Sequence, residues 1–176
     1  MENYLINEKT LAIISNDLIT KVIEEKAILT INKSSLSIID ESCKYYFSSF
    51  HGRCESTKYL LNINCKVPII ISESKQIIFF PTNSPYDKKC IWLNYDYVNK
   101  FYEEEKYINV ILKNDYLIKT NITARVLNNQ ILKTSRLISI LKSNREWFFL
   151  FFNYLLWYNI IVYGSTSKYN NLIMNT

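Results

Sequence analysis

Short apolar runs separated by polar residues dominate the first two thirds of the chain. The runs are rich in isoleucine and valine, and charged residues, asparagine or serine bound each of them. They predict strands at residues 11–14, 27–31, 36–40, 67–72, 76–82 and 90–98. The polar segments 73–75 and 113–115 predict hairpin connections, the second within the apolar segment 101–122. The pattern therefore favours a body made mainly of antiparallel sheet.

A helical period replaces this pattern at residues 124–142. Five side chains fall within an arc of about 80° when each residue turns by about 100°; they are Leu127, Ile131, Thr134, Ile138 and Leu141. The sequence predicts an α+β fold, mainly antiparallel β-sheet with a basic amphipathic helix at about 124–142.

The opposite side of this predicted helix carries Arg125, Lys133 and Arg136. No acidic residue occurs between Asp115 and Glu146. A charged helix face is often only solvated, but soluble helices usually mix both signs. The missing acidic residues favour a face that binds anions.

The composition of the chain excludes some classes of binding site and favours another. Glycine (2 residues) and proline (3 residues) are scarce among the 176 residues, which excludes a glycine-rich phosphate loop or dinucleotide fingerprint. The net charge is +5, and residues 43–144 carry fifteen lysines and arginines against eight acidic residues. A basic middle of the chain is typical of a protein that binds a polyanion.

The four cysteines are Cys43, Cys54, Cys65 and Cys90. The polar N-terminus shows no signal-peptide pattern, so we expect a cytoplasmic protein with reduced thiols. His51 with Cys43, Cys54 and Cys65 could in principle hold zinc, but the spacings match no familiar zinc finger or ribbon. Buried thiols are favoured.

Rare residues concentrate in DESCKYYFSSFHGR, residues 40–53. His51 close to Ser48 and Ser49 suggests a hydrolase, but the chain lacks the GxSxG pattern that would expose a nucleophilic serine. We interpret Gly52 as a turn former and His51 as a turn or surface residue, and we expect no enzyme.

The uncharged aromatic segment 147–164 differs from the rest of the chain. Its 18 residues are at the lower limit for a membrane span, and they include Asn153 and Asn159. A buried helix, a partner-binding face and an out-of-frame tail are alternatives. A membrane-tethered or scaffold protein using residues 147–163 is therefore the alternative function.

Five motifs occur in order between residues 36 and 142. The block at 40–53 is similar to D-x-S-C-R-F-F-x-S-S-Y-x-G-R, and KVPIII, QIIFFPTNS, CIWL and NNQILKTSRL follow it. Together they resemble the bacterial competence transcription factor family, ComK.

The resemblance implies a sequence-specific activator that binds double-stranded DNA without a cofactor. Its members recognise paired A-rich and T-rich promoter boxes of DNA-uptake genes, largely through the minor groove. They bind as homodimers that pair to a tetramer. RNA polymerase is an implied partner, and the implied location is cytoplasmic, at the nucleoid.

Matching positions supply the DNA-binding candidates. The first group is Lys44, Ser48, Ser49 and Arg53. The second group, on the predicted helix, is Arg125, Lys133 and Arg136. Trp92 and the pair Tyr45/Tyr46 are interpreted as core or dimer contacts, and Cys43 and Cys90 as structural.

The resemblance ends near residue 145. We therefore expect a ComK-like DNA-binding domain at 1–145 and a divergent aromatic-rich tail at 146–176. Family members are delivered to the ClpCP protease by the adaptor MecA, which reads an aromatic motif followed by Pro-Lys. Residues 146–151 begin similarly, but the Pro-Lys is absent. A frameshifted end would put adaptor control in doubt and leave the DNA-binding body intact.

Overall fold

The structure is a computed structural model that describes residues 4–16 and 19–173. Side chains are described except at 16, 148, 149, 152 and 154–173. The chain divides into two compact units, Met1–Leu137 and Ile138–Thr176. All the strands belong to the first unit.

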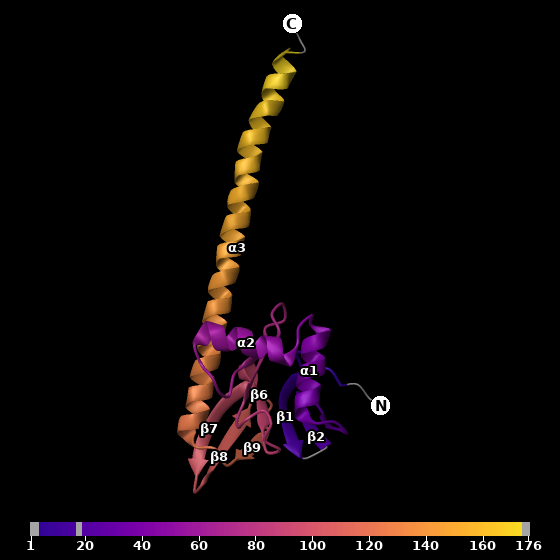
Figure 1. Cartoon of the computed structure of the whole chain (residues 1–176), viewed down its shortest axis with the longest axis vertical. Coiled ribbons are helices and arrows are strands. Elements are labelled where there is room, and N and C mark those ends of the chain that lie inside the picture. The colour runs from indigo at the N-terminus through magenta and orange to yellow at the C-terminus, as the bar shows by residue number, and fades with distance from the viewer. Residues whose placement is uncertain (1–3, 17–18, 174–176) are drawn as a thin grey trace. The chain divides into compact units, whose positions relative to one another are not determined.

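The first unit contains two antiparallel sheets, and Figure 1 labels strands of both. The larger has the order β3-β2-β1-β6-β5-β4 and the smaller the order β7-β8-β9. The strands are β1 (Thr10–Asn16), β2 (Ile19–Glu24), β3 (Ile28–Ile31), β4 (Ile69–Ser72), β5 (Ile77–Pro81), β6 (Ile91–Asn94), β7 (Val98–Glu104), β8 (Tyr107–Leu112) and β9 (Leu117–Thr120). The helices are α1 (Ser35–Tyr45), α2 (Phe50–Leu61) and α3 (Ala124–Ile173), and a 3-10 turn, η1, spans Tyr95–Tyr97. This arrangement confirms the predicted α+β class.

The six-stranded sheet buries both of its faces. Successive residues of a strand point to opposite faces, and on β5 Phe79 joins one core cluster while Phe80 joins the other. Trp92 and Leu93 divide in the same way on β6. The first cluster includes side chains of α1, and the second includes side chains of β8, β9 and the start of α3. The sheet is therefore the middle layer of the first unit.

Helices α1 and α2 cover the first face, and both pack against β4 (Figure 1). The strand predicted at 36–40 is wrong, because these residues lie in α1. Ser34 caps the helix by accepting the Ser37 N–H at 3.1 Å. Ile38, Ile39 and Cys43 lie at helical spacing and are all fully buried. A short β-branched run by itself fits either a strand or a helix, and here its burial against the sheet selects the helix.

The predicted start of the basic helix is confirmed, since α3 begins at Ala124. Thr123 Oγ1 accepts the Val126 N–H at 3.3 Å. Leu127 and Thr134 are fully buried as predicted, and buried Gln130 donates to the Pro81 carbonyl at 2.7 Å. The predicted end at 142 is wrong. No proline follows and the next glycine is Gly164, so the chain has no strong helix breaker near 142.

The second unit contains the remainder of α3, to Ile173. Among the described residues, no helix combines the length and apolar character that crossing a membrane requires. Most side chains of the segment 147–163 lie outside the described residues, so the membrane-tethered or scaffold alternative remains a hypothesis.

The interpretation of Cys43 and Cys90 as structural is confirmed by their complete burial. Burial raises the pKa of the Cys43 thiol to about 12 and that of Cys90 to about 11. Cys54 is half-buried with a pKa raised by burial to about 11, and Cys65 is exposed. No disulfide joins the four.

These environments predict a ranking of thiol reactivity. At pH 7.5 we expect a maleimide to label Cys65 first, because the thiolate is the reactive form and access is required. Cys43 and Cys90 should react only after unfolding. Mass spectrometry of native and urea-treated protein measures this order, and rapid native labelling of Cys43 would contradict it.

Candidate nucleic-acid interface

The block at 40–53 folds as the end of α1, a turn, and the start of α2. Ser49 is the N-cap of α2, and its Oγ accepts the Gly52 N–H at 3.0 Å. The interpretation of Gly52 as a turn former is wrong, because it lies in the first turn of α2 and has no positive φ. A Cβ there would lie 3.3 Å from the Ser49 Oγ, so glycine leaves room for the cap.

The turn between the helices is a Schellman motif with an unusual residue in it. The Ser48 N–H donates to the Cys43 carbonyl at 2.9 Å, and the Phe47 N–H donates to the Lys44 carbonyl at 3.1 Å. Phe47 adopts the left-handed conformation, with φ 61°, at the position where glycine is usual. The conformation costs a non-glycine residue about 1 kcal/mol. The side chain of Phe47 is 100% exposed.

Asp40 fastens the two helices together. Its Oδ1 accepts the Phe50 N–H at 2.9 Å, and its Oδ2 pairs with the Lys44 Nζ at 2.7 Å. The bond with Lys44 and then the bond from Phe50 lower the pKa of the Asp40 carboxyl. The carboxylate therefore holds the start of α2 against the end of α1.

Arg53, in the first turn of α2, is engaged with the connection between β4 and β5. Its side chain is 16% exposed, and its guanidinium Nη1 is ion-paired with Glu73, between β4 and β5. The Arg53 Nε is buried and has no hydrogen-bond partner among the described atoms. A contact between Arg53 and DNA would require this pair to break.

The second group of candidates lies on the first turns of α3. Arg125 and Arg136 are exposed, whereas Lys133 is half-buried and its Nζ donates to the Cys65 carbonyl at 3.0 Å. The structure thus brings Lys44, Ser48 and Ser49 together in one turn and places the α3 residues on a separate element.

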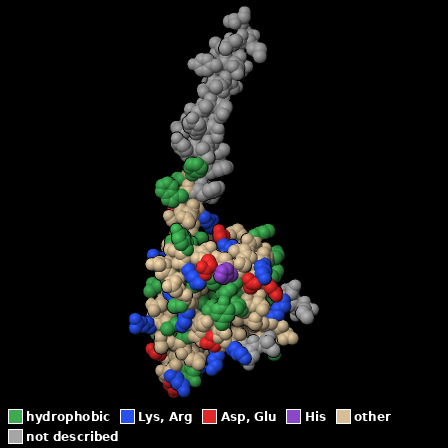
Figure 2. Space-filling view, in the orientation of Figure 1, with side chains coloured by type: hydrophobic (Ala, Val, Ile, Leu, Met, Phe, Trp, Pro, Cys, Tyr) green, Lys and Arg blue, Asp and Glu red, His purple; other side chains and the backbone are tan. Residues whose placement is uncertain are grey.

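Acidic side chains accompany most cations near α1 and α2. Besides the pairs of Lys44 and Arg53, ion pairs join Lys33 to Glu41, Lys58 to Glu55 and Lys75 to Glu8. Figure 2 shows blue and red side chains next to one another on the face that it displays. The excess of lysine and arginine in the sequence does not form a continuous positive field on that face.

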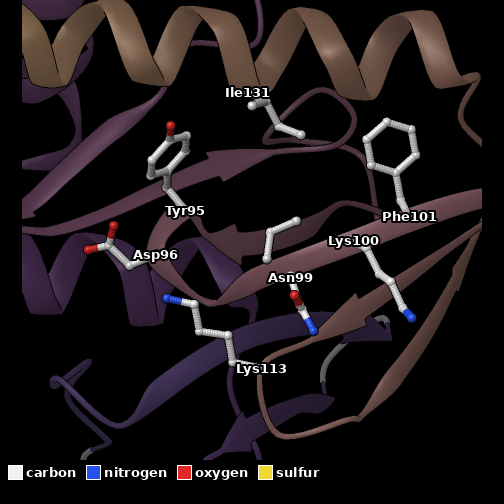
Figure 3. A pocket seen from close by; sticks show the side chains of 8 residues that line it. Tyr95, Asp96, Asn99, Lys100, Phe101, Lys113 and Ile131 are labelled. Carbon is white, nitrogen blue, oxygen red and sulfur yellow. The ribbon is translucent and has the colours of Figure 1, made fainter.

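Two lysines that form no ion pair with a described residue lie near the three-stranded sheet. Lys100 and Lys113 line an open pocket of about 540 Å³, together with Asp96 and the aromatic rings of Tyr95 and Phe101. Figure 3 shows the Lys113 amine on the same side as the Asp96 carboxylate, and the Lys100 amine turned away from them. None of the sequence-predicted candidates lines this pocket.

His51 does not form a catalytic pair in the described residues. It is exposed on α2, as predicted for a surface residue, and no hydrogen bond joins it to Ser48 or Ser49. It lines a second pocket, of about 430 Å³, with Cys54, Cys65 and Tyr86. Figure 2 shows the purple histidine beside green apolar side chains. Within the described residues, no three histidine, cysteine or acidic side chains are grouped to hold a metal ion.

Sequence reasoning missed Phe47 and the two helices that present it. Ser34 and Ser49, each followed by residues that can start a helix, were the available signals for α1 and α2. No sequence signal reports the exposure of Phe47, because an aromatic residue is usually buried.

Comparison with known proteins agrees with this organisation. The family model described as ComK protein matches residues 1–146. The competence transcription factor of Bacillus subtilis (strain 168) is 30% identical over 140 residues, which cover 77% of this chain and 73% of that protein. No solved structure matches the chain.

The lowered pKa of Asp40 predicts a pH-dependent contribution to stability. A depressed pKa stabilises the fold above the unfolded value, near 3.8, and the stabilisation is lost as pH falls through the folded value. Asp40→Asn should lower the free energy of unfolding by less than about 1 kcal/mol at pH 7, and by little at a pH well below the folded pKa of the carboxyl. Urea unfolding at both pH values measures the effect. Lys44→Ala removes the same ion pair and should cost about as much at pH 7; equal losses for Asp40→Asn at both pH values would contradict the assignment.

The Arg53–Glu73 pair predicts an asymmetry between its two partners. Glu73→Ala leaves the mostly buried guanidinium unpaired, so we expect a loss of about 1–3 kcal/mol in unfolding free energy. Arg53→Met removes that charge and keeps most of the volume, so its loss should be smaller. Urea unfolding of both variants decides, and a larger loss for Arg53→Met would show that the pair does not act in this way.

Proposed function

We propose that this chain, which belongs to the ComK family, regulates the transcription of competence genes as a sequence-specific DNA-binding activator. The observation that carries the proposal is the relationship to a competence transcription factor over 140 residues. The family match spans both sheets, the α1–turn–α2 segment and the start of α3. All the DNA-binding candidates lie inside it.

The proposed target is double-stranded DNA with paired A-rich and T-rich boxes, read largely in the minor groove. A narrow minor groove of A·T pairs has an enhanced negative potential, which favours inserted lysine and arginine side chains. Hydroxyl groups add donors to phosphate oxygens. The turn supplies both kinds of group, in the exposed Lys44 and in Ser48 and Ser49.

The candidates differ in what they must give up to reach DNA. Lys44 is 63% exposed at the surface, and its pair with Asp40 is of a kind worth little in water, so a phosphate can replace the carboxylate. Arg125 and Arg136 are exposed and form no ion pair with a described residue that DNA binding would have to break. Arg53 and Lys133 are proposed as contacts only if a phosphate replaces their present partners. These partners are the Glu73 carboxylate for Arg53 and the Cys65 carbonyl for Lys133.

Further partners belong to the same proposal. The protein would bind as a homodimer that pairs to a tetramer on the site, act on RNA polymerase, and work in the cytoplasm at the nucleoid. Control of its level by MecA and ClpCP would act through residues 146–151, of which only residue 146 lies within the range that the family model matches, and the absent Pro-Lys puts this control in doubt.

Two variants at one ion pair test the DNA contact, because they should shift affinity in opposite directions. Lys44→Gln removes a cation and should weaken binding to an A/T-box duplex several-fold, with a fall of about one in the salt slope. Asp40→Asn removes a competing carboxylate and should strengthen binding. Lys26→Ala, at an exposed lysine between β2 and β3, is the control.

A mobility-shift series from low to physiological salt gives the affinities and slopes for the full chain. Netropsin, which occupies the minor groove of A·T tracts, should compete with the protein. Absence of binding by the unmodified chain at low salt would defeat the proposed function. Unchanged affinity for both variants would remove Lys44 from the interface while leaving DNA binding in place.

A further inference from the structure

Phe47 is the most exposed large apolar side chain of the described residues. It projects from the turn between α1 and α2 with an exposed fraction of 100%, whereas Tyr59 and Tyr86, at 88% and 79%, each carry a hydroxyl that water can solvate. We propose that Phe47 is an apolar wedge that inserts between base pairs from the minor groove and bends the DNA; this inference rests on the proposed function.

The backbone at Phe47 carries a cost that burial of its ring does not offset. Its φ of 61° is a conformation that glycine adopts freely and an aromatic residue rarely adopts. The ring packs on no core cluster, so the fold gains no burial from it. A strained residue whose side chain serves no fold contact points to a contact outside the chain.

The turn that carries the ring is held from both ends. The Phe47 and Ser48 N–H groups are bonded to the last turn of α1, at 3.1 and 2.9 Å. Asp40 accepts the Phe50 N–H, and Ser49 caps α2. A wedge must be rigid, because the energy that unstacks a base step would otherwise be lost in moving the loop. The hydrogen bonds supply that rigidity.

The neighbours of Phe47 favour DNA over a protein partner. Lys44 precedes it and Ser48 and Ser49 follow it, so groups that can donate to phosphate lie on both sides of one apolar ring. Proteins that kink DNA from the minor groove combine these same two elements, an apolar wedge and flanking polar contacts. A protein-docking surface would present a broader apolar patch. Among the described residues of the segment 40–53, Tyr45, at 61%, is the one other strongly exposed aromatic.

Substitutions at Phe47 separate this role from folding. Phe47→Gly suits the left-handed backbone, so its thermal midpoint should be no lower than that of the unmodified chain. Its affinity for DNA should fall by roughly tenfold, since a stacked aromatic is lost, while its salt slope should stay the same because the phosphate contacts remain. Phe47→Trp should keep the wedge. Tyr59→Ala, on α2, is the control for loss of an exposed aromatic side chain.

The direct readout is DNA distortion by the full-length protein. A duplex with A-rich and T-rich boxes carries 2-aminopurine at a TA step, which unstacks easily, and a donor and acceptor dye at its ends. We expect binding of the unmodified chain, Phe47→Trp and Tyr59→Ala to raise the 2-aminopurine fluorescence and shorten the end-to-end distance. Phe47→Gly should bind without either change.

The outcomes distinguish the two proposals. If the unmodified chain binds no DNA, both the proposed function and the wedge fail. If it binds but Phe47→Gly distorts the duplex equally, or if the unmodified chain leaves the duplex undistorted, the wedge alone is overturned. A Phe47→Gly chain that changes its sedimentation but not its effect on DNA would assign the ring to self-association instead, and would also overturn the wedge.

Discussion

Burial of both faces of the six-stranded sheet is the constraint on which the rest of the first unit depends. Phe79 and Phe80, neighbours on β5, belong to opposite core clusters, and Trp92 and Leu93 repeat this on β6. A sheet that is apolar on both faces must be covered twice. Helices α1 and α2 cover one face, and the three-stranded sheet with the first turns of α3 covers the other. The turn that carries Lys44, Phe47 and Ser48 is therefore positioned by the core beneath its two helices.

Ion pairing decides how the positive charge of the chain can be used. Near α1 and α2 each paired cation has its own carboxylate, so total charge is a poor guide to where a polyanion would lie. What differs among the pairs is solvation. The Lys44 amine is mostly in water, so it can exchange its partner at little cost in free energy. The Arg53 guanidinium is mostly buried, so separating it from Glu73 would leave a buried charge without a partner. Exposure therefore separates a residue suited to contact DNA from one suited to hold the β4–β5 turn.

The same region shows how stability and presentation are balanced. The Schellman motif closes α1 with the expected hydrogen bonds, but it does so with phenylalanine where glycine would be easier. Asp40 and the Ser49 cap add hydrogen bonds that keep the turn in place despite this strain. The fold thus holds Phe47, a strained and fully exposed aromatic residue, in the turn between α1 and α2. Groups that can bind phosphate lie before and after it in the chain.

Local pattern by itself determined most of the strands and the start of α3. Apolar β-branched runs between polar residues located β1, β3, β4, β5 and β6, because strand spacing and turn chemistry are local properties. The strand predicted at 36–40 is wrong, and β2 is absent from the predicted strands. A short β-branched run can form either a helix or a strand until tertiary packing selects one of them. Only the tertiary structure decided that Ile38, Ile39 and Cys43 pack as a helix on the sheet. It also decided that Arg53 meets Glu73, twenty residues away, and that Phe47 is left in water, because contacts between distant segments and the exposure of a single ring depend on how the whole chain packs.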